Sequence, residues 1–236
     1  MQLCGVKIDN VSMEEALNKI RDFLNDSRQH YIVTPNPDFL ILAQKDKEFK
    51  EILNKADLSL PDGIGLVWAA RLMGESLKER VAGVDLIENC KLKIEDLRIF
   101  LLGGYQGAAE KVAKNWPAAV GFSEEADSIE LLARINQCQP NILFAALGAP
   151  RQEKWIAKNL SKIPSVKVAI GVGSALNLLS GQIKRAPRIF QALGLEWLWR
   201  LFREPRRWRK ILRSLIMFPF LVFKSKIKAS GEVPEA

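Results

Sequence analysis

Apolar runs with the character of buried strands alternate along this chain with segments whose apolar residues recur at a helical period. The strand-like runs are Tyr31–Thr34, Arg98–Leu102, Asn141–Leu147 and Val166–Ile170. A nearly continuous apolar run is typical of a strand that is buried on both faces, as in a parallel sheet. Their alternation with helices predicts an α/β fold, a Rossmann-like and mainly parallel sheet with helices on both faces.

Local signals place further elements at the edges of this pattern. Residues Gln2–Ile8 are expected to form one short strand. Ser12 and Glu15 have the spacing of a capping box, so we expect a helix to begin at residue 13. Ser123 is expected to cap a later helix that contains Ile129.

Glycine-rich turns follow three of the expected strands, at Gly103-Gly104, at Gly148-Ala149-Pro150 and at Gly171-Val172-Gly173. Ligands of open parallel sheets bind at the carboxyl ends of the strands, and glycine lets a ligand approach the backbone closely. These turns therefore suit a phosphorylated ligand. The chain contains neither a G-x-G-x-x-G turn after its first strand nor a P-loop sequence, so a dinucleotide site is not favoured.

The stretch Leu60-Pro61-Asp62-Gly63-Ile64-Gly65 places a carboxylate on a tight turn between an apolar run and a helical segment. Two interpretations of Asp62 stay open on this pattern alone. It caps the following helix, or it faces a ligand and acts as a general base toward a hydroxyl. Thr34 and Asn36 follow another strand at the same kind of position.

Few side chains are available for metal or thiol chemistry. The single histidine, His30, opens a strand-like run and is expected to be structural or exposed, which disfavours a histidine-based zinc site or a Ser-His-Asp triad. Cys4, Cys90 and Cys138 match no metal spacing and no even disulfide framework, which indicates a reducing cytosolic compartment. The N-terminus lacks the pattern of a signal peptide. We expect no metal and no cofactor, with catalysis by carboxylates, hydroxyls and arginines.

Positive charge is concentrated near the C-terminus. Of a net charge of +8, residues 184–236 supply 13 Lys/Arg against four Asp/Glu, and the remaining chain is almost neutral. We expect a catalytic α/β domain over residues 1–193 and a basic appendage over residues 194–236, with an exposed linker at Lys184–Arg188. The appendage region has two amphipathic helical stretches, Phe190–Phe202 and Pro205–Met217.

Aromatic residues beside dense lysine and arginine are typical of a segment that lies in the membrane interface. The apolar run Ser214–Phe223 is far shorter than the roughly 20 residues that span a bilayer. Two alternatives are a basic helix packed on the core and a nucleic-acid patch. Long apolar side chains suit acyl chains better than phosphodiesters, which favours an anionic membrane surface and no nucleic acid.

Seven blocks of this sequence, in order and over nearly the whole chain, together resemble the WecG/TagA/CpsF glycosyltransferases. The blocks are Thr34-Pro35-Asn36, Leu60–Gly65, Glu79–Asp85, Ala146–Trp155, Gly171-Val172-Gly173, Lys184-Arg185-Ala186-Pro187 and Gly194-Leu195-Glu196-Trp197.

The resemblance implies an enzyme of bacterial surface-polymer synthesis, such as that of wall teichoic acid, peripheral at the cytoplasmic face of the membrane. The best-known activity of the family transfers N-acetylmannosamine, or its uronic acid, from UDP to undecaprenyl-diphosphate-linked N-acetylglucosamine, with inversion and without metal. By this resemblance Asp62 is the general base, Thr34 and Asn36 lie near the transferred sugar, and Arg80 contacts a phosphate or the sugar.

Two further sets of residues follow from the resemblance. Donor binding is expected at Gly103, Gly104, Gly148, Pro150, Gln152, Gly171, Gly173 and Asn177. The lipid diphosphate is expected at Arg200, Arg207, Arg209 and Lys210, on an appendage that reaches over the active site. Lys210 and Asn177 replace an arginine and an acidic residue of the family, and lysine keeps the charge without the bidentate fork of arginine.

Structural alternatives and other functions also stay open. Arg80 is alternatively a salt-bridge partner of Glu79 or Asp85, Gln152 a first-turn helix residue, and Gly148 and Gly173 packing positions. The other functions are a transferase of the same family that uses another UDP-hexose, and a non-catalytic membrane adaptor whose body binds no nucleotide. The resemblance is compatible with a monomer or a small homo-oligomer.

Overall fold

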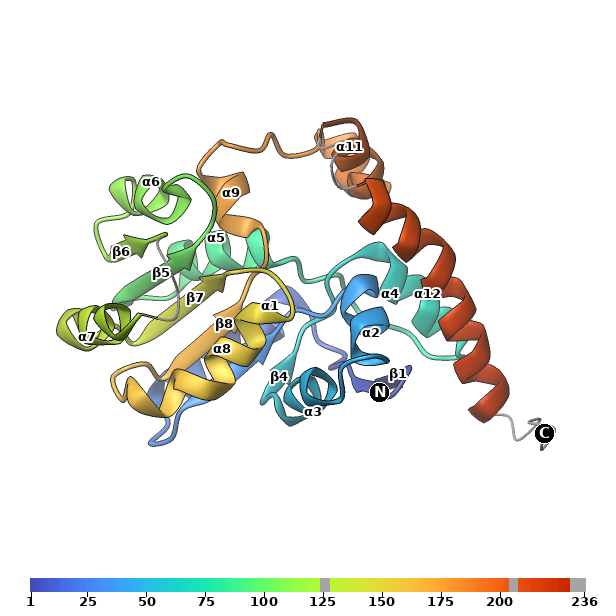
Figure 1. Ribbon diagram of the computed structural model, residues 1–236, viewed down its shortest axis with the longest axis horizontal. Coiled ribbons are helices and arrows are strands. Elements are labelled where there is room, and N and C mark those ends of the chain that lie inside the picture. Colours follow the sequence, from blue (N-terminus) through green and yellow to red (C-terminus); the bar gives the residue numbers. More distant parts are fainter. Residues whose placement is uncertain (124–127, 204–207, 230–236) are drawn as a thin grey trace.

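The computed structural model describes residues 1–123, 128–203 and 208–229. Its centre is a six-stranded sheet in the order β4-β3-β8-β7-β5-β6, and every neighbouring pair is parallel (Figure 1). The strands are β3 (His30–Val33), β4 (Leu58–Ser59), β5 (Ile99–Gly103), β6 (Ala119–Phe122), β7 (Ile142–Ala146) and β8 (Val168–Gly171). This confirms the predicted α/β fold.

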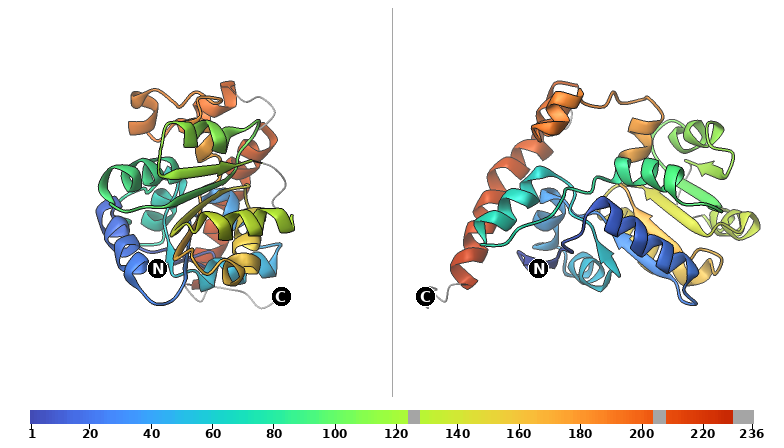
Figure 2. Two further views of the ribbon diagram at one scale, coloured as in Figure 1. Left: turned by 90° about the vertical axis from the view of Figure 1, so that its left-hand side faces the viewer. Right: turned by 180° about the vertical axis from the view of Figure 1, so that it is seen from behind.

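Helices cover both faces of the sheet (Figure 2). Ile99 and Leu101 of β5 belong to one hydrophobic cluster while Phe100 and Leu102 belong to another, because successive side chains of a strand point to opposite faces. The first cluster includes side chains of α1 (Met13–Asn25), α5 (Gly83–Lys93), α6 (Ala108–Lys114) and α9 (Ala175–Leu179). The second includes side chains of α7 (Ile129–Cys138) and α8 (Arg151–Asn159), which is followed by the 3-10 helix η1 (Leu160–Lys162).

A third hydrophobic cluster lies beside the β4 edge of the sheet. It joins β1 (Gln2–Leu3), β2 (Val6–Lys7), α2 (Pro37–Ala43), α3 (Lys47–Lys55) and α4 (Ile64–Leu72). The predicted single strand over Gln2–Ile8 is wrong, since β1 and β2 form an antiparallel hairpin. Cys4 and Gly5 have positive φ angles of 51° and 76° and make the turn between them.

Several local predictions can be compared with the structure directly. Ser12 and Glu15 form the expected capping box at the start of α1. Ser123 is not the cap of α7, because Ser128 accepts from the Leu131 amide at 3.2 Å. His30 is buried, and its ring stacks on Phe23 with the centroids 4.0 Å apart, which confirms a structural role.

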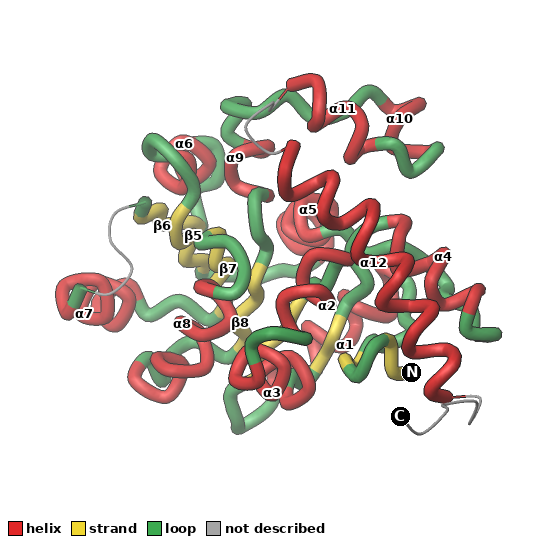
Figure 3. The backbone as a smooth tube through the Cα atoms, turned by 45° about the vertical axis from the view of Figure 1, so that its right-hand side comes forward, coloured by secondary structure: helices red, strands yellow, loops and turns green. Residues whose placement is uncertain are grey.

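Three helices form the C-terminal region: α10 (Arg188–Ala192), α11 (Glu196–Arg203) and α12 (Trp208–Ala229). The predicted helix over Phe190–Phe202 is interrupted at Gly194, which has a φ of 71°. The second predicted helix extends beyond Met217, through Pro219, to Ala229. Figure 3 shows α12 running alongside α2 and α4. Among the described helices, none combines the length and the apolar composition that crossing a membrane requires.

Candidate active site

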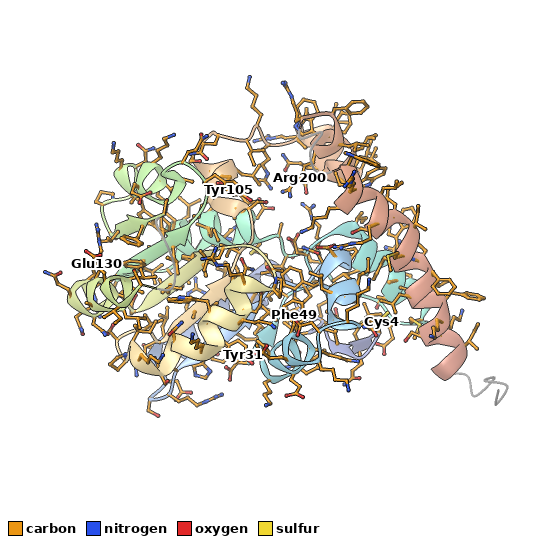
Figure 4. The ribbon with its side chains drawn as sticks, viewed as in Figure 1. Cys4, Tyr31, Phe49, Tyr105, Glu130 and Arg200 are labelled. Atoms are coloured by element: carbon orange, nitrogen blue, oxygen red, sulfur yellow. The ribbon has the colours of Figure 1, made fainter. Side chains whose placement is uncertain are left out.

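A cavity of about 750 Å³ lies where the carboxyl ends of the central strands meet the C-terminal helices. Thr34, Asp62, Gly148 and Gly173, which follow β3, β4, β7 and β8, form one wall. Arg200 of α11 and Lys210 of α12 contribute to the opposite wall. In Figure 4 Arg200 lies on the side of α11 that faces the α/β body. The sheet edge and the C-terminal helices therefore enclose one site.

Asp62 sits on the turn between β4 and α4, and its side chain lines the cavity. The residue that caps α4 is Gly63, and no side-chain hydrogen bond caps this helix, so the helix-cap interpretation of Asp62 is wrong. The Asp62 amide donates to the Pro35 carbonyl at 2.8 Å, which ties its turn to the segment between Thr34 and Asn36. Gly63 has a φ of 100°, a conformation that side chains other than glycine rarely adopt.

The Asp62 carboxyl is poised for proton transfer near neutral pH. Burial raises its pKa to about 6. Arg80 and Arg200 oppose this increase, whereas Glu196 and Asp85 add to it. A general base works best when its pKa lies close to the operating pH.

Thr34 and Asn36 both line the cavity, and each is held by the fold. The Thr34 hydroxyl donates to the Gly171 carbonyl at 2.7 Å and so links the residue after β3 to the last residue of β8. The Asn36 side-chain oxygen caps α2 by accepting from the amides of Asp38 and Phe39 at 3.0 and 3.3 Å. Its NH₂ group is therefore the part that is left for a ligand.

Arg80 lines the same cavity and forms an ion pair with Glu196 of α11. Its other terminal nitrogen lies 4.0 Å from Asp85. The alternative in which Arg80 is a salt-bridge partner thus holds in part, although its principal partner is Glu196. The sequence pointed to Glu196 only through the block Gly194–Trp197 and gave it no role.

The glycines of the expected donor site fall into two groups. Gly148 and Gly173 line the cavity with positive φ angles of 77° and 58°, and a β-carbon at either position would have nothing within 4 Å. Packing alone therefore does not explain them. At Gly103, Gly104 and Gly171 a β-carbon would lie 2.7, 2.6 and 2.8 Å from its nearest neighbour, so these three glycines permit close packing and do not line the cavity.

Gln152 lies beneath the glycine turns and does not line the cavity. Its side-chain oxygen accepts from the amides of Gly148 and Gly173 at 3.2 and 3.0 Å, and its NH₂ group donates to Glu153 at 2.6 Å. One buried side chain in the first turn of α8 thus holds the two turns that border the cavity.

Two other residues near these turns have defined surroundings. Glu153 is fully buried, and burial raises the pKa of its carboxyl to about 7. Sequence reasoning missed it, although it stands within the matched block Ala146–Trp155. Asn177 is also buried outside the cavity lining, and it accepts from the Tyr105 amide at 2.8 Å, so it connects α9 to the turn after β5.

The basic residues expected to meet a lipid diphosphate are spread over two helices. Arg200 donates to the Ser174 hydroxyl at 3.3 Å, and Lys210 pairs with Asp38 at 2.9 Å. Arg209 stacks over the Trp208 ring and borders a second cavity of about 430 Å³, to which Pro150 also contributes. Arg207 lies outside the described residues.

The arrangement has the components of a group-transfer site: a carboxylate with a pKa near 6, polar groups from neighbouring strands, and cations from α11 and α12. Within the described part of the chain, no group of three or more His, Cys, Asp or Glu side chains is placed to hold a metal ion.

Comparison with known proteins gives consistent matches over the whole chain. A sequence model of the family described as "Glycosyl transferase WecG/TagA/CpsF family" matches residues 1–232. The N-acetylglucosaminyldiphosphoundecaprenol N-acetyl-beta-D-mannosaminyltransferase of Bacillus spizizenii is 34% identical over 200 residues, which cover 80% of this chain and 77% of that protein. The protein of the same name from Staphylococcus aureus strain MRSA252 is 31% identical over 244 residues, which cover 97% of this chain and 94% of that protein.

Proposed function

The chain belongs to the WecG/TagA/CpsF glycosyltransferase family, and we propose that it moves N-acetylmannosamine from a UDP-sugar to N-acetylglucosamine on undecaprenyl diphosphate. The names of its relatives support this acceptor and this transferred sugar. The reaction belongs to the synthesis of a bacterial cell-surface polymer, wall teichoic acid or a related polysaccharide.

The observation that carries the mechanism is the position of Asp62 in the cavity, with Arg80 and Arg200 close enough to affect its pKa. In the proposed step, the acceptor hydroxyl gives its proton to Asp62 while its oxygen attacks the anomeric carbon of the donor sugar. A new glycosidic bond forms, the bond from that carbon to the UDP oxygen breaks, and UDP leaves with the electron pair. Attack opposite the leaving group inverts the anomeric configuration.

Negative charge develops on the diphosphate as UDP departs. The amides of Gly148 and Gly173 already donate to Gln152, so these two amides are not available to bind the diphosphate. We therefore assign stabilisation of the leaving group to Arg80, which lines the same cavity, and we assign Arg200 and Lys210 to the diphosphate of the acceptor lipid. In this mechanism a cationic side chain offsets the negative charge that develops on the leaving group.

The C-terminal helices supply the proposed contact with the membrane at its cytoplasmic face. Ile216, Phe220 and Phe223 of α12 are 64%, 70% and 58% exposed, and Lys224 and Lys226 follow them. Exposed apolar side chains beside lysines suit the interface of an anionic bilayer. We propose that residues 1–193 form the catalytic part and residues 194–236 the membrane-associating part. The second part completes the active site, because Glu196, Arg200 and Lys210 line the cavity.

The direct test incubates the purified full chain with UDP-N-acetylmannosamine and a lipid-linked N-acetylglucosamine diphosphate, and measures the mass of the lipid product. Parallel reactions with UDP-N-acetylglucosamine and UDP-glucose test whether this enzyme transfers another hexose instead. The expected result is addition of one N-acetylhexosamine from UDP-N-acetylmannosamine only. Binding of UDP without transfer from any donor would count against the proposal, and absence of UDP binding would favour a non-catalytic adaptor.

A further inference from the structure

The main cavity has a second, apolar arm between α4 and α12. Trp68 and Leu72 of α4 line one side of it, and Leu215, Phe218 and Val222 of α12 line the other. The two helices are in close contact here, since a β-carbon at Gly65 of α4 would lie 3.6 Å from the Phe218 ring. The arm belongs to the same cavity as Asp62, Arg200 and Lys210, so a polar site and an apolar groove are continuous.

The groove is closed at its base and open at its rim. Phe218 and Val222 are buried in the hydrophobic cluster of α2 and α4, and they form the base. Trp68, Leu72 and Leu215 are 68%, 49% and 44% exposed, and they form the rim. Large apolar side chains gathered at an exposed surface usually mark a binding site.

The groove leads away from the charged end of the cavity along both helices. Leu72 lies eight residues beyond the start of α4 at Ile64, and Val222 lies twelve residues beyond Lys210 in α12. At 1.5 Å per residue, the apolar end is about 12–18 Å from the charged end. The cavity thus offers cations for an anionic head and, next to them, an apolar channel for a hydrocarbon chain.

We propose that this groove between α4 and α12 binds the isoprenoid units adjacent to the diphosphate of the acceptor lipid. The inference rests on the proposed function, because it names a subsite for the same acceptor. Arg200 and Lys210 meet the diphosphate, and the chain leaves between Trp68 and Leu215. Ile216 and Phe220 of the same helix are exposed, so α12 offers apolar side chains to the bilayer from which the lipid would enter.

The test compares acceptors that share the N-acetylglucosaminyl diphosphate head and differ in the prenyl group, dimethylallyl or farnesyl, without any bilayer. Wild-type protein should use the farnesyl acceptor with a kcat/KM about tenfold or more higher, because the added methylenes become buried. Leu72→Asn and Leu215→Asn should each bring this ratio toward one. Leu92→Asn is the matched control, since Leu92 of α5 is 79% exposed and lies outside the cavity lining, and it should keep the wild-type ratio.

A binding experiment tests the groove without the transfer reaction. In calorimetric titrations, farnesyl diphosphate should bind wild-type protein more tightly than inorganic diphosphate, and Leu72→Asn and Leu215→Asn should reduce that difference. Equal affinity for both ligands, or a difference in affinity that both variants retain, would overturn the proposal that the groove binds the isoprenoid units. Preference for farnesyl diphosphate in a protein that transfers no sugar would support the groove and reject the proposed function, so the two failures are distinguishable.

Discussion

Asp38 of α2 is ion-paired with Arg213 of α12, although 175 residues separate them in the sequence. Lys210 reaches the same carboxylate at 2.9 Å. The Asp38 side chain is 6% exposed, whereas those of Lys210 and Arg213 are 47% and 38% exposed, so a buried anion is neutralised by two half-exposed cations. The contact holds the start of α12 over the cavity. A lipid diphosphate that binds Lys210 therefore competes with Asp38.

Replacing Asp38 should loosen the attachment of α12. In Asp38→Asn the two cations lose their buried partner but remain hydrated. We therefore expect the free energy of detaching α12 from the body to fall by about 1–3 kcal/mol. Amide hydrogen exchange in α12 should become about tenfold faster or more. Glu51→Gln, which breaks an exposed pair with Lys55 at 3.9 Å, is the control and should leave α12 unchanged. Unaltered exchange of α12 in Asp38→Asn would show that apolar packing alone holds this helix.

The general base of the proposed reaction can be tested by one substitution. Asp62→Asn keeps the size of the side chain but removes the group that accepts the proton, so kcat should fall by about 10²–10⁴-fold. Binding of the UDP-sugar, measured by calorimetry, should persist because the basic residues remain. Turnover at the wild-type rate would exclude Asp62 as the base.

The sequence was sufficient for those parts of the fold that local patterns determine. Buried parallel strands produce continuous apolar runs, so Arg98–Leu102 and Asn141–Leu147 predicted β5 and β7 closely. The capping box at Ser12 is a contact between residues three apart, and it was equally readable. Asp62 was placed at the sheet edge because it follows a strand and precedes a helix.

Contacts between distant segments left no comparable local signal. Nothing in the sequence around Gln152 indicates that its side chain joins the turns of Gly148 and Gly173, because Gly173 lies 21 residues further along the chain. The pair of Arg80 and Glu196 likewise depends on how α11 returns over the sheet. Continuation of α12 through Pro219 opposes local propensity, and burial of Phe218 and Val222 on either side of this proline stabilises the helix there.

Glu196 should tune the acid limb of the pH–rate profile. Glu196 raises the pKa of Asp62, and it also holds Arg80, which lowers that pKa. Wild-type activity should therefore rise with pH through about 6, as Asp62 becomes ionised. In Glu196→Gln the raising effect disappears and Arg80 loses its partner, so the acid limb should move to lower pH.

A second carboxylate of the same network provides the control for this measurement. Glu88 lies 3.6 Å from Arg185, which also approaches Glu196 at 4.0 Å, but Glu88 is not among the groups that shift the pKa of Asp62. Glu88→Gln should therefore leave the acid limb in place. Equal displacement in both variants, or in neither, would refute a specific effect of Glu196 on Asp62.

The buried Glu153 should make the stability of the fold depend on pH. Its pKa is raised from 4.5 to about 7, so the folded protein holds this proton more tightly than the unfolded chain. The free energy of unfolding should therefore fall as pH rises from about 4.5 to 7, by up to about 3 kcal/mol from this group. Glu153→Gln cannot ionise, so it should gain stability relative to wild type between pH 5 and pH 8.

Urea unfolding of wild type and Glu153→Gln at both pH values isolates this contribution, because all other titrating groups are common to the two proteins. Glu130→Gln, on the exposed surface of α7 (Figure 4), is the control and should shift the unfolding midpoint alike at pH 5 and pH 8. A constant stability difference between wild type and Glu153→Gln would mean that Glu153 is ionised in the folded protein. The carboxylate would then need a cationic partner, and Lys210, which lowers the pKa of Glu153, is the group to test by substitution.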